Sequence, residues 1–181
     1  MEIRERNANI ANNVGFANTI KTQDSTFGKG IPKLTLRDRD GNVIQEYTNR
    51  NTIVIVGRSK LIKMLTGDSN SRITQCALGT KGVDSTIDPW IPIPPTENDT
   101  ALYEEVVGSK KNIDSYIYED GPRPLSVTFT TLFRSEDVDA IVSEAALIFN
   151  DETMFARHTF PSMYLKADRG YSLEISWEIQ F

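Results

Sequence analysis

The sequence predicts a mainly β protein: an antiparallel β-sandwich or barrel with one short helix and an extended N-terminal arm. Three observations lead to this fold class. Residues 173–181 alternate without exception between apolar and polar side chains, residues 126–133 carry a second alternating run, and residues 141–149 are almost continuously apolar. Alternation is typical of a strand with one buried face, whereas a short continuous apolar run is typical of a strand buried on both faces.

The N-terminal arm is predicted at residues 1–30. This segment contains five asparagines and only scattered apolar residues, and Gly28 and Gly30 close it. Because it has too few apolar side chains to bury a core of its own, we expect either a mobile tail or an arm that orders against a neighbouring subunit. The remaining residues, 31–181, have the usual length of one domain and are expected to form a single β-rich domain.

A hairpin and the helix are predicted in the first half of this domain. Residues 34–36 and 43–47 have extended patterns, and Asp40 and Gly41 between them supply turn chemistry, which predicts a β-hairpin. Apolar residues then recur at helical spacing between two glycines, which predicts one short helix at residues 57–66 that covers the sheet.

A long loop follows the strand predicted at residues 73–78. Residues 83–100 contain four prolines, which give few backbone donors to a sheet and favour extended geometry. Trp90, Ile91 and Ile93 lie among these prolines. We therefore expect an exposed loop whose apolar residues dock on another protein chain.

An ion pair is predicted between Glu144 and Arg157. Glu144 interrupts the apolar run at residues 141–149, where a charge is costly unless it is paired. Arg157 lies on the next predicted strand, residues 154–160, and is the candidate partner. A structural ion pair is favoured over a catalytic acid. Phe181 ends the last strand in the register of its apolar face, so it is also a candidate interface residue.

No residue pattern indicates catalysis, a cofactor or a metal site. His158 is the only histidine and Cys76 the only cysteine, so the chain lacks a zinc-ligand set and a disulfide pair. We expect Cys76 to be a small buried residue and His158 to be a hydrogen-bonded core or interface residue, on the same strand face as Met154, Ala156 and Phe160, and we expect both to be chemically silent. The chain also lacks the glycine-flanked serine typical of hydrolases. Residues 38–42 resemble a calcium loop only superficially and are predicted as the hairpin turn. The chain is therefore not expected to be an enzyme.

Charge and hydropathy exclude two further classes of partner. The formal net charge is −5, and the basic residues are dispersed among acids, so nucleic acid is not expected to be the main ligand. No stretch of 18 apolar residues occurs, and no apolar core follows the charged first residues, so we expect no membrane insertion and synthesis in the cytoplasm.

The C-terminal third resembles structural proteins of tailed bacteriophages. The resemblance is carried by SEAALIF at residues 143–149, TMFARHTF at 153–160 and LEISWEIQF at 173–181, and the middle section adds GRSKL at 57–61, LGTKG at 78–82 and DTAL at 99–102. It implies a β-rich virion component of the neck, collar, tail or fibre region, located in the virion. It covers roughly residues 50–181 and implies no catalytic residues.

Two functions are therefore expected as alternatives. In the first, many copies bind each other and neighbouring virion proteins, as a homo-oligomer, through sheet faces, the proline-rich loop and the N-terminal arm. In the second, exposed loops that carry Trp90, Tyr116 and Tyr118 bind a host-surface carbohydrate or receptor. A defined oligomer or a complex with virion proteins distinguishes the first function, and binding to isolated cells or glycans distinguishes the second.

Overall fold

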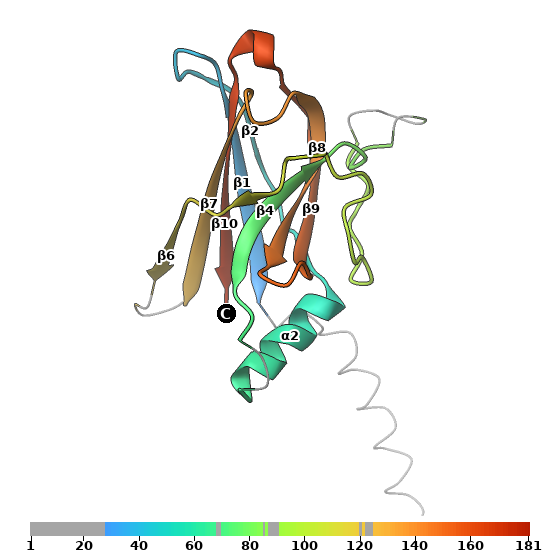
Figure 1. The fold of residues 1–181 in the computed structure, drawn as a ribbon, viewed down its shortest axis with the longest axis vertical. Helices are drawn as coiled ribbons and strands as arrows, with labels where there is room; N and C mark the ends of the chain where they lie inside the picture. Colours follow the sequence, from blue (N-terminus) through green and yellow to red (C-terminus); the bar gives the residue numbers. More distant parts are fainter. Residues whose placement is uncertain (1–27, 68–69, 85, 87–90, 120, 122–124) are drawn as a thin grey trace, which may run out of the picture.

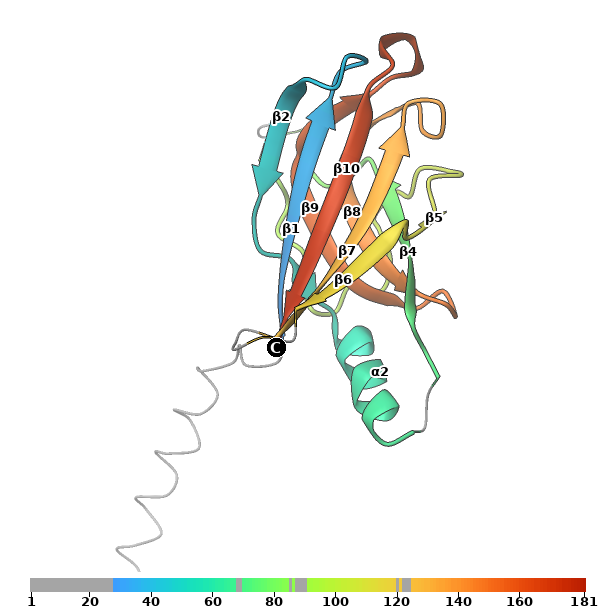
Figure 2. The same ribbon diagram turned by 90° about the vertical axis from the view of Figure 1, so that its left-hand side faces the viewer.

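Two antiparallel sheets of five strands each pack face to face (Figures 1 and 2). This computed structural model describes residues 28–67, 70–84, 86, 91–119, 121 and 125–181. The predicted mainly β fold is confirmed, and the two separate sheets make it a sandwich and not a barrel. Residues 1–27 of the predicted arm lie outside the described residues, whereas residues 29 and 30 already belong to the first strand.

The first sheet has the strand order β2-β1-β10-β7-β6. Its strands are β1 (Lys29–Arg37), β2 (Val43–Thr48), β6 (Ser115–Glu119), β7 (Ser126–Arg134) and β10 (Ser172–Gln180). The predicted hairpin is the β1–β2 pair, and its turn is closed by Asp38, whose Oδ1 accepts hydrogen bonds from the backbone N–H groups of Asp40 and Asn42 at 2.9 and 2.8 Å. β10 alternates between buried and half-buried residues, as its sequence predicts.

The second sheet has the order β3-β9-β8-β4-β5. Its strands are β3 (Thr52–Ile53), β4 (Ile73–Gly79), β5 (Lys111–Asn112), β8 (Ala140–Phe149) and β9 (Met154–Leu165). Every residue of β8 from 142 to 149 is buried, so both faces of this strand are covered. One face packs against the first sheet, and chain outside the two sheets covers the other.

The α-helix α2 (Ile55–Leu65) lies at one end of the sandwich and begins two residues before the predicted start (Figure 1). The apolar run at residues 53–56 is divided between β3 and this helix. Gly57 allows the first turn to lie directly on β9, because a Cβ atom there would stand 2.4 Å from the Phe155 carbonyl oxygen. A short 3₁₀ helix, η1 (Ala167–Arg169), precedes β10.

The buried apolar residues form two clusters. The larger fills the space between the sheets, and the smaller lies on the outer face of the second sheet and consists of Val54, Ala77, Ala146, Ile148 and Met154. Met154 was expected on the same face as Ala156 and Phe160, and this is wrong. The register of β9 shifts by one residue between Met154 and Ala156, so the two side chains belong to different clusters.

His158 lies in the interior, 1% exposed, among the aromatic rings of Tyr47, Phe160 and Trp177. Among the described residues its ring nitrogens have no hydrogen-bond partner of ordinary geometry, so the expectation of a hydrogen-bonded histidine is wrong. Burial lowers the pKa of His158 to about 4, and the neighbouring Arg50 backbone opposes this shift only partly. The ring is therefore neutral in the folded protein at neutral pH.

His158 is expected to make the fold sensitive to mild acid. Between pH 6.5 and about 4 the unfolded chain takes up a proton at this ring and the folded chain does not, so stability present above pH 6.5 is lost as the pH falls. The loss amounts to about 3 kcal/mol by pH 4. Urea unfolding at several pH values measures it. In His158→Phe, which keeps an aromatic ring in an aromatic site, this part of the pH dependence should disappear, and an unchanged slope would refute the assignment.

Candidate functional site

One continuous segment of the chain crosses the outer face of the second sheet. It consists of residues 91–109, and we call it the strap. Several hydrogen bonds hold its first part against the domain. The Ile93 N–H donates to the Gly82 carbonyl at 2.8 Å, and the Ile93 carbonyl accepts from the Thr159 hydroxyl at 2.8 Å. The Thr52 hydroxyl donates to the Pro95 carbonyl at 3.2 Å. The strap therefore contacts β9 and β3 before it reaches the charged residues.

The last part of the strap runs along β4. The Thr80 N–H donates to the Glu104 carbonyl and the Val106 N–H donates to the Leu78 carbonyl, both at 2.9 Å. The Ser109 hydroxyl donates to the Leu78 carbonyl and accepts from the Leu78 N–H, both at 3.0 Å. Both parts of the strap are thus attached to the same sheet.

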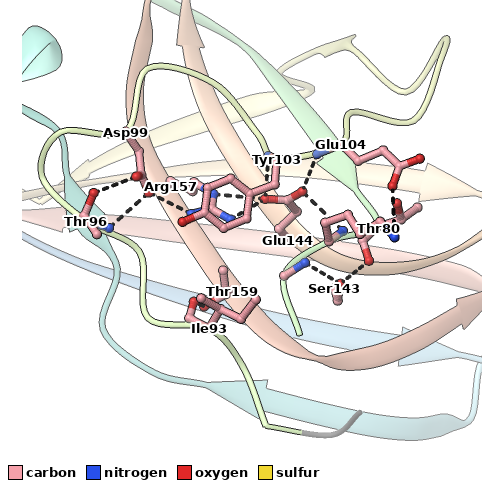
Figure 3. Close-up of polar contacts among 12 residues, drawn as sticks. Thr80, Ile93, Thr96, Asp99, Tyr103, Glu104, Ser143, Glu144, Arg157 and Thr159 are labelled. Atoms are coloured by element: carbon pink, nitrogen blue, oxygen red, sulfur yellow. Dashed lines mark hydrogen bonds and ion pairs between the residues drawn. The ribbon is translucent and has the colours of Figure 1, made fainter. Parts of the chain in front are cut away.

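A buried ion network lies between the strap and the sheet (Figure 3). Glu144 Oε2 accepts hydrogen bonds from Arg157 Nε at 2.9 Å and Nη2 at 2.6 Å, so the pair predicted from the sequence is present. Arg157 Nη1 donates to Asp99 Oδ2 at 2.7 Å. The side chains of Glu144 and Arg157 are fully buried, and that of Asp99 is 9% exposed. Arg157 on β9 thus joins β8 to the strap.

Backbone donors complete the coordination of the two carboxylates. The N–H groups of Tyr103 and Glu104 donate to Glu144 at 3.1 and 3.0 Å, and Thr96 donates to Asp99 through its N–H and its hydroxyl at 3.0 and 2.6 Å. These donors offset the excess negative charge of two carboxylates around one guanidinium.

The guanidinium of Arg157 is covered by an aromatic ring. Its central carbon lies 3.7 Å from the ring centre of Tyr103, a cation–π contact that closes the network toward solvent. Burial by itself would lower the pKa of Arg157, but the hydrogen bonds and charges of Asp99 and Glu144 outweigh burial and raise that pKa. Arg157 therefore stays charged.

Close backbone packing beside the network depends on Gly82. A Cβ atom at this position would lie 1.9 Å from the Ser143 carbonyl oxygen, which no side chain tolerates. The Ser143 hydroxyl also accepts a hydrogen bond from the Gly82 N–H and donates one to the Thr80 carbonyl, both at 2.8 Å. Gly82 thus permits direct contact between the segment after β4 and β8.

The polar groups of this site form hydrogen bonds within the fold. Both carboxylates accept hydrogen bonds from the guanidinium, and the Ser143 hydroxyl uses its proton on a backbone carbonyl. Cys76 is fully buried in the interior, where burial raises the pKa of its thiol to about 12. Within the described ranges, no three His, Cys, Asp or Glu side chains are grouped to hold a metal ion. The arrangement attaches the strap to the sheet.

The interface candidates that the structure describes lie at two separate places. Trp90 lies outside the described residues. Ile91 is 58% exposed at the start of the strap and Ile93 is half-buried. Most of residues 91–100 are exposed, as expected for this loop, and hydrogen bonds attach it to the second sheet. Phe181 is 62% exposed and lies at the end of the sandwich beside α2, as the position of the C-terminus in Figure 1 shows.

No family model, curated protein or solved structure matches the chain. Among the described residues, no helix is both long and apolar enough to cross a bilayer. The site is thus defined by its geometry: a buried guanidinium, two carboxylates and a strap bonded to the sheet beneath it.

Arg157→Met is expected to lower the free energy of unfolding by about 3 to 5 kcal/mol, because it leaves Glu144 buried without its cation. Urea unfolding at neutral pH measures the change. Lys33→Met is the matched control, since Lys33 forms an exposed ion pair with Glu46 and should have little effect. A loss below about 1 kcal/mol for Arg157→Met would show that the network contributes little to stability.

Glu144→Gln is expected to loosen the strap while the sandwich stays folded. The neutral amide has one acceptor oxygen for the five donors that the two carboxylate oxygens now share, and its NH₂ group faces donors. Hydrogen–deuterium exchange should become faster in peptides that cover residues 99–109, and exchange in β10 should stay slow. Glu46→Gln, which changes an exposed carboxylate, is the control. Unchanged exchange in the strap would contradict this role for Glu144.

Proposed function

We propose that the chain is a structural component of a tailed-bacteriophage virion, in the neck, collar, tail or fibre attachment, and that it acts by protein–protein assembly. The C-terminal motifs that resemble phage structural proteins support this proposal. In the structure their large residues fill the core, as Phe149, Phe155, Phe160 and Trp177 are buried, and their charged residues form the Glu144–Arg157 pair. The residues of these motifs thus form the interior of the fold, and binding is expected to involve other residues, at the surface.

The observation that carries the proposal is a cluster of exposed apolar side chains at one end of the sandwich. On β6, Tyr116 and Tyr118 are 59% and 69% exposed, and Phe181 nearby is 62% exposed. Ile117, on the opposite face of the same strand, is 65% exposed. Soluble monomers rarely expose large contiguous apolar surfaces, and such surfaces commonly mark protein interfaces. A chain that assembles with other chains would bury these side chains.

An apolar groove of about 250 Å³ accompanies this cluster. Its walls come from α2, from the β6–β7 pair and from the ends of β8 and β9, and they include Leu61, Met64, Tyr116, Phe129, Phe155 and Phe181. Among the described residues that line the groove, only Arg72 is charged. This composition suits an apolar segment of another protein better than a charged small molecule.

Recognition of a host-surface carbohydrate or receptor is the second candidate. A hollow of about 780 Å³ beside η1, at the other end of the molecule, is lined by Tyr164 and Tyr171 together with Asp139, Lys166 and Arg169. Aromatic rings next to charged hydrogen-bonding groups can stack on a sugar ring and bind its hydroxyls. Tyr116 and Tyr118, which were expected on a loop but lie on strand β6, have ring centres 5.3 Å apart and offer a second aromatic surface.

The two candidates are separated by purifying phage particles that encode the chain and measuring its abundance by quantitative mass spectrometry. The assembly function predicts a fixed copy number relative to the major capsid protein and retention after a high-salt wash. In parallel, the isolated chain is tested for binding to host cells and to a glycan array. Absence from intact particles would overturn the virion proposal, and saturable cell or glycan binding lost in Tyr164→Ala would favour recognition.

A further inference from the structure

β6 is the outermost strand of the first sheet, and no described residue pairs with its outer edge. Figure 2 shows this strand at the margin of the sheet, next to β7. Edge strands of soluble proteins are usually protected by charges, prolines or bulges. β2, at the opposite margin, has Glu46 near its centre and a register shift in its pairing with β1, whereas the central three residues of β6 are tyrosine, isoleucine and tyrosine.

β6 presents an exposed apolar side chain on each of its faces, and Ser115 and Glu119 flank Ile117 on the second face. Tyr116 and Tyr118 pair with Phe129 and Val127 of β7 and share their face, which lines the apolar groove. Ile117 pairs with Thr128 and lies on the opposite face, 65% exposed. The strand thus exposes apolar side chains in both directions next to an open edge.

We propose that β6 pairs antiparallel with β6 of a second copy of this chain, about a twofold axis at Ile117, so that the two first sheets become one continuous sheet. This inference deepens the proposed assembly function by naming a surface and its occupant. An interface between identical copies must be complementary to itself. The sequence of β6 meets this condition residue by residue.

In this register Ile117 lies opposite Ile117 of the second copy, and Tyr116 lies opposite Tyr118. Ser115 lies opposite Glu119, so the only charge of the strand does not meet its own copy. Directly opposed aromatic and β-branched side chains stabilise antiparallel pairs, and opposed like charges destabilise them. The four tyrosines would lie on one face and extend the aromatic cover over the grooves of both copies.

The expected association is modest, because a five-residue edge buries less area than a standard interface. Sedimentation velocity of the full chain should show a monomer–dimer equilibrium with a dissociation constant on the order of 10 µM. Ile117→Lys should weaken dimerisation by at least about tenfold, because it opposes two cations on the axis.

Two substitutions of one residue test the register. Ser115→Lys places a cation opposite Glu119 of the second copy and should strengthen the dimer, whereas Ser115→Glu places an anion there and should weaken it. Ile44→Lys, on the exposed edge strand β2, is the control and should leave dimerisation unchanged. Circular dichroism and thermal unfolding confirm that each variant is folded.

The proposal is overturned if the chain stays monomeric up to about 100 µM, a concentration well above the expected constant. It is also overturned if Ile117→Lys and Ser115→Glu leave the dimer intact, or if deletion of residues 1–27 abolishes dimerisation, since that segment would then supply the contact. Failure of this proposal is distinct from failure of the virion proposal. A chain found in particles but insensitive to the β6 substitutions would assemble through another surface.

Discussion

The buried guanidinium of Arg157 is the interaction on which the outer layer of this protein depends. Its three donor nitrogens bind one carboxylate from β8 and one from the strap, at 2.6 to 2.9 Å. Removing three charged groups from water is costly, and the cost is offset only where nearly every donor and acceptor finds a partner. Backbone N–H groups of the strap provide the missing donors, so the network and the conformation of residues 91–109 require each other.

This dependence explains why β8 is buried on both faces. Its inner face meets the first sheet, and its outer face is covered by the strap and the small apolar cluster that includes Ala146 and Ile148. In many proteins a layer of helices would cover such a strand. Here a segment without helices does so. It is bonded at the Ile93 carbonyl, at Asp99 and at the Ser109 hydroxyl, and its backbone groups are satisfied through the sheet below.

The sequence was sufficient to predict a mainly antiparallel β fold, because a period of two residues indicates a strand with one buried face, but only the two separate sheets of the structure distinguish the sandwich from a barrel. The sequence also identified Glu144 and Arg157, since a charge inside an apolar run requires a partner nearby. Asp99 was missed because it lies 58 residues from Arg157, in a segment without periodicity. Met154 was assigned to the wrong face because a single extra residue in β9 reverses the alternation, and no local pattern marks that bulge.

The pairing of β1 with β10 has a consequence for how the chain reaches this structure. The first described strand, Lys29–Arg37, pairs along its whole length with the last, Ser172–Gln180, and β10 also pairs with β7. The central strand of the first sheet, β10, is therefore missing until that part of the chain has been synthesised. Such contacts between distant parts of a chain slow folding, because a large loop must close before they form. Until β10 has been synthesised, the β1–β2 hairpin stays an unpaired sheet fragment, so a low concentration of unfinished chains favours the correct product.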